Sequence, residues 1–549
     1  MVYIDFADVS YVLPNSRPLL TGVSFKVTNG QHLALIGANG AGKSTLIRLL
    51  EGAVSASSGQ INHSGNIGYL RQFTSSGTVR DLLLNVSPQR IRQAAHRIEE
   101  AQRQLTSNTD KVNIEYADAI TNWGDIGGYE YELLWNRCTK DILGKDYSEV
   151  ANRQAQTLSG GEQKRLALAA LFESEFDILV LDEPDNYLDV YGKQWFERTL
   201  NGSAKTVLYI SHDRHLLEQT AHTIVSLELN ESGNVAWTHH GKFSSFLEAR
   251  KRRFDRFEEI NRRWHEEHLK LINLVERYRI KAVYNDNMAS RYKAAQTRLK
   301  RYESTTALQK LPRPQDITMK FPDIEPGSQS VVCSSLSIDG LTGPLSTTIR
   351  TGERIAVSGK NGVGKSHFLK LLGSTADLTE HEGLVPAGEL YEPVRYSGTY
   401  SLGAGIRPGW FSQTHERPDL KGRSLVDILH RGTSIREGMP EDEALEALAK
   451  YELQFVAFDN FENLSGGQQA RFQILLLELG GASLLLLDEP TDNLDLESAQ
   501  ALQAALRDYR GAVIAVTHDR WFAQEFERFI IFERDGEVRE SYHPDWEMS

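Results

Sequence analysis

Hydrophobic residues recur along the chain with two different periods. From residue 1 to about 240, and again from about 328 onward, short apolar runs rich in β-branched residues alternate with segments whose apolar positions recur every three or four residues. This alternation of predicted strands and helices favours an α/β core with a largely parallel sheet. Between these regions helical spacing dominates, until a stretch with four prolines at 311–330 predicts an extended tether. We therefore predict two α/β domains, 1–240 and 328–549, joined by a linker at 241–327.

The linker pattern predicts two helices. Apolar side chains follow three- and four-residue steps in two segments: Phe254, Phe257, Ile260, Trp264, Leu271, Val275 and Tyr278 in the first, and Met288, Tyr292, Leu299 and Tyr302 in the second. The sequence YNDN at 284–287 predicts a turn between them. We expect an antiparallel hairpin, packed along an apolar seam, whose first helix is much longer than its second.

The two outer regions repeat each other. GANGAGKST, LSGGEQ, LDEP and SHDR in the first region return in the same order as GKNGVGKSH, LSGGQQ, LDEP and THDR in the second. The serine of LSGG precedes the aspartate of LDEP by 23 residues in both regions, and that aspartate precedes the histidine of HDR by 30. Equal spacing over this length indicates an internal duplication.

Each half carries GxxxxGK[ST] between an apolar predicted strand and a predicted helix, which is the context that a P-loop requires. The glycines let backbone N–H groups surround phosphate oxygens, and the helix N-terminus adds partial positive charge. The lysine would bridge the β- and γ-phosphates of ATP, and the serine would ligate Mg²⁺. The predicted ATP-binding residues of the loops are Gly37, Asn39, Gly40, Gly42, Lys43, Ser44, Thr45, Gly359, Asn361, Gly362, Gly364, Lys365, Ser366 and His367, with Ser44 and Ser366 also as metal ligands.

Two further motifs supply acids and an anion site. An apolar predicted strand ends in Asp182 and Glu183 in the first half and in Asp488 and Glu489 in the second. We expect each aspartate to hold Mg²⁺, directly or through water, and each glutamate to polarise the attacking water. The LSGG segments form another anion-binding helix N-terminus, with Ser159, Gly160, Gly161, Ser465, Gly466 and Gly467 as its predicted nucleotide contacts.

The P-loop, LSGGQ, LDEP and HD elements, in this order, resemble the ATP-binding cassette (ABC) superfamily. The resemblance covers both halves and implies that two cassettes face each other head to tail, with each ATP between the P-loop of one half and the LSGG of the other. It also implies that His212 and His518 contact the γ-phosphate, and that Gln72 and Gln413 touch Mg²⁺ and the attacking water. Tyr11 is placed to stack on adenine, with a role in the core as the alternative, and the second half has no matching aromatic residue.

One departure from the family pattern follows the first LDEP. Asp185 stands where the family usually has threonine, which is present as Thr491 in the second half. Extra negative charge near the nucleotide would make the two sites unequal in hydrolysis. Because both glutamates are present, we expect both sites to be competent.

Charge distinguishes the linker from the rest of the chain. The chain has 61 Lys+Arg and 74 Asp+Glu, a formal charge of -13. Residues 242–313 alone have 19 Lys+Arg and 9 Asp+Glu, a net charge of +10, which leaves -23 for the remainder. Such a basic segment is typical of polyanion binding. The predicted RNA-binding residues cluster near the turn: Arg277, Arg279, Lys281, Arg291, Lys293, Arg298, Lys300 and Arg301.

Composition indicates an ordinary globular protein, with 40% hydrophobic and 25% charged residues. Its two cysteines are too few for a disulfide framework and fit a reducing cytosol. No apolar run reaches the roughly 18 residues of a membrane helix. We expect a cytoplasmic monomer with an intramolecular cassette pair.

The whole arrangement resembles the ABC-F family of translation factors, which carry twin cassettes and a charged helical linker on one chain. GKFSSFLEARKRRF and ASRYKAAQTRLKRYE resemble the linker helices of that family. The resemblance implies that the ATP-bound, closed protein binds the ribosomal tRNA exit site, that its hairpin reaches rRNA and peptidyl-tRNA near the peptidyl-transferase centre, and that hydrolysis releases it. Some members protect ribosomes from macrolides and related antibiotics, and others regulate translation. The linker and DEPDNYLD resemble actinobacterial macrolide-resistance members, whereas the short tip at 282–289 is typical of housekeeping members.

The first half also contains about 35 more residues between Gln72 and Ser159 than the second half contains between Gln413 and Ser465. This insertion, at about 85–150, resembles the small arm of ABC-F proteins. Arg90, Arg92, Arg97 and Arg103 would contact ribosomal RNA or protein, with a plain packing helix as the alternative.

Two other functions remain open on the sequence. One is the ATPase subunit of a transporter with separate membrane subunits, and the other is a DNA-associated structural ATPase. In either case the hairpin would be a spacer or a DNA contact.

Overall fold

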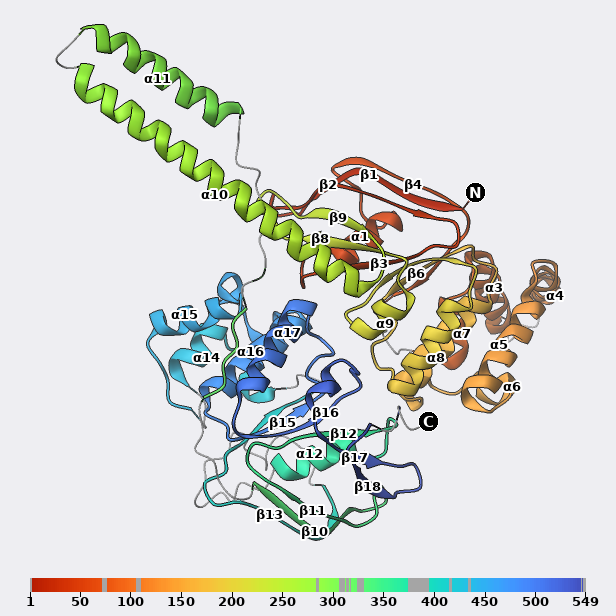
Figure 1. Ribbon diagram of the computed structural model, residues 1–549. Helices are drawn as coiled ribbons and strands as arrows, with labels where there is room; N and C mark the ends of the chain where they lie inside the picture. Colours follow the sequence, from red (N-terminus) through yellow and green to blue (C-terminus); the bar gives the residue numbers. More distant parts are fainter. Residues whose placement is uncertain are drawn as a thin grey trace.

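The computed structural model describes residues 2–71, 77–104, 110–282, 286–305, 312, 315, 317–322, 330–373, 394–413, 417–432, 436–544 and 546. Figure 1 shows two α/β bodies, one from each half of the chain, with a helical hairpin extending away from them. The predicted fold class, two P-loop domains in tandem joined by a helical hairpin, is confirmed.

The first half is built around a six-stranded sheet in the order β5-β6-β7-β3-β8-β9. All neighbouring pairs are parallel except that β9 joins the edge antiparallel. Every residue of β6, β7 and β8 is buried, as expected of central strands covered on both faces. The strands are β3 (His32–Gly37), β5 (Ile67–Leu70), β6 (Ile178–Asp182), β7 (Thr206–Ile210), β8 (Thr223–Glu228) and β9 (Val235–His240).

The second half repeats this sheet as β14-β15-β16-β12-β17-β18. It too is parallel except for its last strand. The strands are β12 (Arg354–Gly359), β14 (Pro408–Phe411), β15 (Leu484–Asp488), β16 (Ala512–Val516), β17 (Arg528–Phe532) and β18 (Val538–Ser541). The matching order confirms that the duplication in sequence is a duplication of structure.

Each half adds a three-stranded antiparallel sheet, β2-β1-β4 in the first and β11-β10-β13 in the second. These sheets pack over the P-loop helices through shared hydrophobic clusters. Their strands are β1 (Tyr3–Val12), β2 (Pro18–Thr28), β4 (Ser58–Ser64), β10 (Val331–Ile338), β11 (Leu345–Ile349) and β13 (Tyr396–Leu402).

Helices cover the remaining faces of the main sheets. In the first half they are α1 (Lys43–Leu50), α2 (Val79–Asn85), α3 (Gln89–Gln104), α4 (Asp110–Asp125), α5 (Gly128–Leu143), α6 (Tyr147–Val150), α7 (Gly160–Glu173), α8 (Val190–Asn201) and α9 (Arg214–Thr220). In the second half they are α12 (Lys365–Gly373), α14 (Leu425–Arg431), α15 (Glu441–Lys450), α16 (Gly466–Leu479) and α17 (Leu496–Asp508). The predicted arm insertion contains α3, α4 and α5, which lie together at one side of the first half (Figure 1).

The linker forms the expected unequal hairpin, with α10 (Phe243–Ala282) 40 residues long and α11 (Asp286–Thr305) 20 residues long. The seam contains the stacked rings of Trp264 and Tyr302, whose centroids are 5.8 Å apart, and the buried side chain of Leu271. Of the predicted turn at 284–287, residues 284 and 285 lie outside the described residues, whereas 286 and 287 belong to α11.

One predicted seam residue faces solvent instead. Ile260 is 47% exposed. The reason is the length of the partner helix: α11 ends at Thr305, and the ion pair of Glu303 with His268 shows which part of α10 its last turn reaches. The periodicity of α10 continues toward its base, beyond the point where α11 stops.

Candidate functional site

The P-loops join the end of a central strand to the start of a helix in both halves: β3 to α1, and β12 to α12. The first glycine of each loop has no room for a side chain. A Cβ on Gly37 would lie 2.6 Å from the carbonyl oxygen of Leu227, and a Cβ on Gly359 would lie 2.3 Å from that of Phe532. Both glycines also have positive φ, 147° and 134°.

The P-loop lysines point back into their own loops. Lys43 Nζ donates to the carbonyl oxygen of Gly37 at 2.7 Å, and Lys365 Nζ donates to that of Gly359 at 2.7 Å. Burial lowers the pKa of Lys43, although the carboxylates around it act in the opposite direction. Each loop therefore holds the amine of a buried lysine against the carbonyl of its own first glycine.

The first P-loop faces the second half's LSGG motif across a cavity of about 280 Å³. Its lining includes these predicted site residues: Asn39, Gly40, Gly42, Lys43, Ser44, Thr45, Glu183 and His212 from the first half, and Ser465, Gly466 and Gly467 from the second. The expected head-to-tail pairing is therefore the arrangement in the structure.

The second cavity, of about 360 Å³, has the reciprocal composition. Its predicted site residues are Asn361, Gly362, Gly364, Lys365, Ser366, His367, Gln413, Asp488, Glu489 and His518 from the second half, and Ser159, Gly160 and Gly161 from the first. Two composite cavities, each with one P-loop and one LSGG segment, thus lie between the halves.

The LSGG serines cap the helices that follow them. Ser159 caps α7 in a capping box with Glu162, and Ser465 caps α16 in the same way with Gln468. The cassettes approach closely here, since a Cβ on Gly467 would lie 1.8 Å from Nδ2 of Asn39. A side chain at that position would displace the amide of Asn39, which reaches this place from the opposite half.

Matching polar contacts join the two halves. Asn39 Nδ2 donates to the carbonyl oxygen of Asn493 at 3.0 Å, and Asn361 Nδ2 donates to that of Tyr187 at 3.1 Å. The backbone N–H of Asn39 also donates to Oδ2 of the buried Asp495 at 2.9 Å. The loops after each LDEP therefore reach the P-loop of the opposite half.

Farther from the cavities, two arginines cross the interface at matching places in the repeat. Arg520 pairs with Glu197, and Arg214 Nη1 donates to Oε1 of Gln503 at 2.6 Å. All four side chains are largely buried in the cassette pair. These contacts require both halves, so they stabilise the paired arrangement.

The predicted catalytic glutamates occupy strained backbone positions. Glu183 has φ of 50° and Glu489 has φ of 48°, in the left-handed region that non-glycine residues rarely adopt. Their backbone N–H groups donate to Ile210 at 3.1 Å and to Val516 at 3.0 Å, which holds the turn in place. Strain of this kind, kept by specific hydrogen bonds in both halves, is typical of functional sites.

The environment of Glu489 suits a base. Burial, together with the nearby Asp492, raises the pKa of Glu489 well above its ordinary value. Its Oε2 accepts a hydrogen bond from the backbone N–H of His518 at 2.9 Å. A carboxylate with a raised pKa takes up a proton from water more readily than an exposed one.

The two strand-end aspartates fit a divalent cation. Oδ1 of Asp182 and Oδ1 of Asp488 are buried and accept no hydrogen bond from the residues that the structure describes. Burial raises the pKa of each aspartate to about 6, while hydrogen bonds to the hydroxyls of Ser44 and Ser366 lower it. A carboxylate and a hydroxyl that meet in this way match the oxygen ligands that Mg²⁺ prefers.

The two predicted γ-phosphate histidines differ. His518 Nε2 lies 3.1 Å from Oδ1 of Asn361 and 3.4 Å from Oε1 of Glu489. Both ring nitrogens of His212 are buried without a hydrogen-bond partner among the described residues. Burial lowers the pKa of both rings, for His212 to about 3, so both are neutral at pH 7.

Tyr11 does not line either cavity. It lies in β1, opposite Leu20 of β2, and packs against the hydrophobic core of the first half. Leu19 and Leu341, at matching places in the repeat, line the two cavities instead. No motif marks these leucines; only the repeat, once aligned, relates them. Gln72 lies outside the described residues.

The eight predicted RNA-binding residues are all exposed, on the last turns of α10 and on α11. One of them, Arg279, pairs with Glu276 of the same helix at 2.7 Å. The hairpin, which extends away from the two α/β bodies (Figure 1), thus carries these positive charges on its surface.

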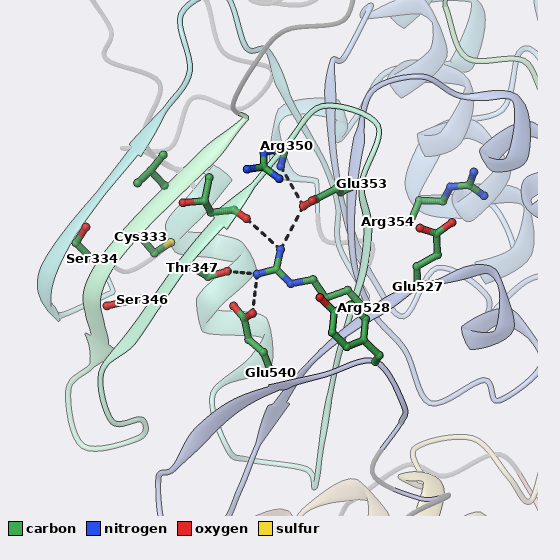
Figure 2. Close-up of a pocket in the computed structure, with 13 residues that line it drawn as sticks. Cys333, Ser334, Ser346, Thr347, Arg350, Glu353, Arg354, Glu527, Arg528 and Glu540 are labelled. Atoms are coloured by element: carbon green, nitrogen blue, oxygen red, sulfur yellow. Dashed lines mark hydrogen bonds and ion pairs between the residues drawn. The ribbon is translucent and has the colours of Figure 1, made fainter.

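A larger cavity, of about 570 Å³, lies beside β10 and β11 of the second half. Figure 2 shows Arg528 at its centre, where it donates to the carbonyl oxygen of Thr348, to Oγ1 of Thr347, and to carboxylates of Glu353 and Glu540. Both Nη atoms of Arg528 are engaged in these contacts, which join β17 to β11 and β18 within one cassette.

Comparison with known proteins identifies the family. The family model described as "ABC transporter" matches residues 20–186 and 342–492. A Mycobacteroides abscessus protein named "Antibiotic resistance protein" is 46% identical over 552 residues, which cover 100% of both chains. The mouse "ATP-binding cassette sub-family F member 3" is 30% identical, over 95% of this chain and 69% of its own.

A third relative is the "Energy-dependent translational throttle protein EttA" of Escherichia coli, 27% identical over 96% of this chain and 92% of its own. Among solved structures, the archaeal ribosome recycling factor aABCE1 in complex with stalk protein aP1 matches 97% of this chain and 89% of its own, with a TM-score of 0.56 and 17% identity. That likeness concerns the fold. Among the described residues, no helix combines the length and apolar character needed to cross a membrane. With two ABC cassettes on one chain and relatives of sub-family F along its length, the protein belongs to the ABC family of ATPases and, within it, to the ABC-F group.

Proposed function

We propose that the protein is a cytoplasmic ATPase that binds the ribosome while ATP holds its cassettes together, and that hydrolysis releases it. The observation that carries this proposal is a basic, exposed hairpin mounted on an ATP-dependent cassette pair. The net charge of +10 over residues 242–313, which contain the hairpin, in a chain of -13, favours an RNA partner, because phosphate contacts would add affinity without requiring a particular sequence. The names of the relatives, an antibiotic resistance protein and a translational throttle protein, support the same function.

The composite cavities suggest how the chain would handle ATP. Lys43 and Lys365 would neutralise the β- and γ-phosphates, and the LSGG helix N-termini of the opposite half would complete each site. Mg²⁺, held by Ser44 and Asp182 in one site and by Ser366, Asp488 and Gln413 in the other, would supply charge neutralisation between the phosphates. Gln72 is the matching predicted ligand of the first site.

The residues of this chain would then perform hydrolysis and report it. Glu183 and Glu489 would orient and deprotonate the attacking water, because their strained turns aim them into the cavities. The neutral imidazoles of His212 and His518 would donate a hydrogen bond to the γ-phosphate. Loss of that phosphate removes the charge that both halves share, so the cassettes would separate and the hairpin would leave its RNA.

The finer proposal concerns the place of action. We propose that the protein occupies the tRNA exit site and that Arg277, Arg279, Lys281, Arg291, Lys293, Arg298, Lys300 and Arg301 contact rRNA and peptidyl-tRNA near the peptidyl-transferase centre. The names of the relatives support two outcomes of that contact, antibiotic resistance or regulation of translation. For the first outcome we propose macrolides and related antibiotics as the drugs concerned.

The double variant Glu183→Gln and Glu489→Gln tests ribosome binding. It should bind ATP without hydrolysing it and therefore accumulate on ribosomes when a bacterial lysate with ATP is sedimented on a sucrose gradient. Failure to accumulate would refute the proposal, and co-sedimentation with a membrane partner would favour a transporter subunit instead. Reversing the charge of Arg291, Lys293 and Arg298 should abolish ribosome binding while basal ATP hydrolysis continues.

Growth tests separate the two outcomes. A sensitive host that expresses the protein should survive higher concentrations of macrolide if the protein protects ribosomes. The double glutamate variant should give no such protection, because it would not be released. Equal sensitivity of all strains to a panel of ribosome-targeting antibiotics would leave translational regulation as the function.

A further inference from the structure

A buried lysine lies at the cassette interface in a place that no motif marks. Lys193 stands in the first turn of α8 and is only 6% exposed. At the matching place in the second half the chain has Ala499, and where the first half has Asp185 the second has Thr491. At these two matching places the first half therefore has a buried acid and a buried base, and the second half has neither.

The ammonium group of Lys193 connects the two cassettes. It lies 3.0 Å from Oδ2 of Asp213, in its own cassette. It also donates to the backbone carbonyl oxygen of His518, in the other cassette, at 3.3 Å. A single side chain thus holds together the two loops that follow β7 and β16.

Lys193 also faces several carboxylates from both sides of the interface. Burial alone would lower its pKa, yet the surrounding acids raise it above the ordinary value, so the lysine is charged. The acids that act on it are Asp213, Asp492, Asp185 and Asp519, two from each cassette. Like charges brought together in a buried place repel one another unless a cation lies between them.

Two of these contacts lead directly to the ATP cavities. His518 lines the cavity of the second P-loop, and its ring bonds with Asn361 of that loop. Asp492 lines both cavities and accepts a hydrogen bond from Gln413 at 3.3 Å. Lys193 therefore lies between the two sites without touching either P-loop.

We propose that Lys193 is a positioning residue that couples closure of the cassettes to the second ATP site, by neutralising the aspartates that meet across the interface and by holding the backbone of His518. This inference rests on the composite ATP sites proposed above. The coupling is one-sided, because Ala499 has no donor to offer the loop of His212. Loss of Lys193 should therefore impair the second site more than the first.

Three substitutions test the role. Lys193→Met keeps the length of the side chain and removes its charge; Lys193→Ala combined with Asp185→Thr recreates the pattern of the second half, with acid and base removed together. Lys205→Met is the matched control, since Lys205 is a partly buried lysine of the same cassette whose side-chain hydrogen bonds, among the residues that the structure describes, go to the carbonyls of Ser174 and Phe176 of that cassette. Thermal unfolding of each variant verifies that it is folded.

Closure is measured by energy transfer between one fluorophore on each cassette during titration with ATP. We expect Lys193→Met to need about 10- to 100-fold more ATP for closure, since breaking a buried ion pair costs far more than breaking an exposed one. Lys205→Met should close like the unaltered protein. The double variant should recover most of the closure that Lys193→Ala alone loses.

Hydrolysis at single sites gives an independent readout. With Glu183→Gln silencing the first site, Lys193→Met should lower the kcat of the second site more than it changes the KM for ATP. With Glu489→Gln silencing the second site, the same change should have a smaller effect. If Lys193→Met closes normally, or if the double variant closes no more readily than Lys193→Ala, the role of Lys193 is refuted while the composite sites stand. Absence of ATP-dependent closure in the unaltered protein would overturn the composite sites as well.

Discussion

The base of the hairpin touches both cassettes, and the contact with the second should control how readily they close. Arg250 of α10 pairs with Glu497, in the first turn of α17, at 2.5 Å; the two side chains are only 24% and 20% exposed. Three residues further along α10, Arg253 pairs with the buried Glu228 of the first cassette at 2.6 Å. The helix is thus anchored to the first cassette and linked to the second by a partly buried ion pair.

The structure gives the size of the effect. A hydrogen bond between charged groups contributes about 1.5–3 kcal/mol when well shielded, and solvent access to this pair reduces that to about 1–2 kcal/mol. Since each 1.4 kcal/mol is a factor of ten, Arg250→Met should shift the closure equilibrium about 5- to 30-fold toward separated cassettes. Glu497 lies two residues beyond Asp495, whose Oδ2 receives the N–H of Asn39. The first ATP site should therefore lose more affinity than the second.

Energy transfer between the cassettes, titrated with ATP, measures this shift. Arg252→Met is the matched control, because Arg252 pairs with Glu248 of the same helix in an exposed position, with exposures of 81% and 72%. Such a pair is worth at most about 0.5 kcal/mol, so closure should hardly change. Exchanging the partners, Arg250→Glu with Glu497→Arg, should recover part of the loss. If Arg250→Met and Arg252→Met behave alike, the contact does not link the hairpin to closure.

Three further predictions concern pH, the nucleotide and the hairpin. Burial, and then the imidazole stacked on it, lower the pKa of His32 from 6.5 to about 4. Between pH 6.5 and about pH 4 the imidazole of His32 is protonated in the unfolded chain but neutral in the folded chain, so the free energy of unfolding should fall by up to about 3 kcal/mol as the pH drops through this window. The thermal midpoint of His32→Phe should therefore decline less steeply with falling pH than that of the unaltered protein. Leu19→Ala should weaken ATP binding in a fluorescent-nucleotide titration, whereas Tyr11→Ala should not, and the reverse order would restore adenine stacking by Tyr11. Tyr302→Ala removes a ring stacked in the seam and should speed hydrogen exchange in the hairpin while leaving that of the cassettes unchanged.

The duplicated cassettes could be predicted from sequence because their motifs are local. A P-loop needs its glycines and lysine within eight residues, so its position and its strand–helix context are visible without the rest of the chain. The close approach of Gly467 to Asn39 is different, since it joins residues more than 400 positions apart. Only resemblance to a known family indicated that pairing.

Two expectations show that periodicity and residue type do not reveal what stands opposite a residue. Ile260 has the correct helical spacing for the seam, yet α11 ends before reaching it. Tyr11 has the chemistry for adenine stacking, and that role stays a prediction; its strand packs it against the core, whereas Leu19 lines the cavity. In both cases the deciding quantity is the length or register of a neighbouring element.

Asp185 shows the same principle for charge. The sequence alone suggested added negative charge near the nucleotide, but Asp185 lines neither cavity and is 6% exposed. Burial, and then Asp213, raise its pKa to about 7, while the nearby Lys193 lowers it. Buried Lys164 also lies close, with a pKa lowered to about 8 by burial and raised in turn by Asp185. Both lysines occupy places that the second half fills with alanine, Ala470 and Ala499. Where the second cassette has a threonine and two alanines, the first has one acid and two bases, and of these bases Lys193 donates to the opposite cassette. We therefore expect any inequality between the ATP sites to depend on this one-sided cation rather than on added negative charge near the nucleotide.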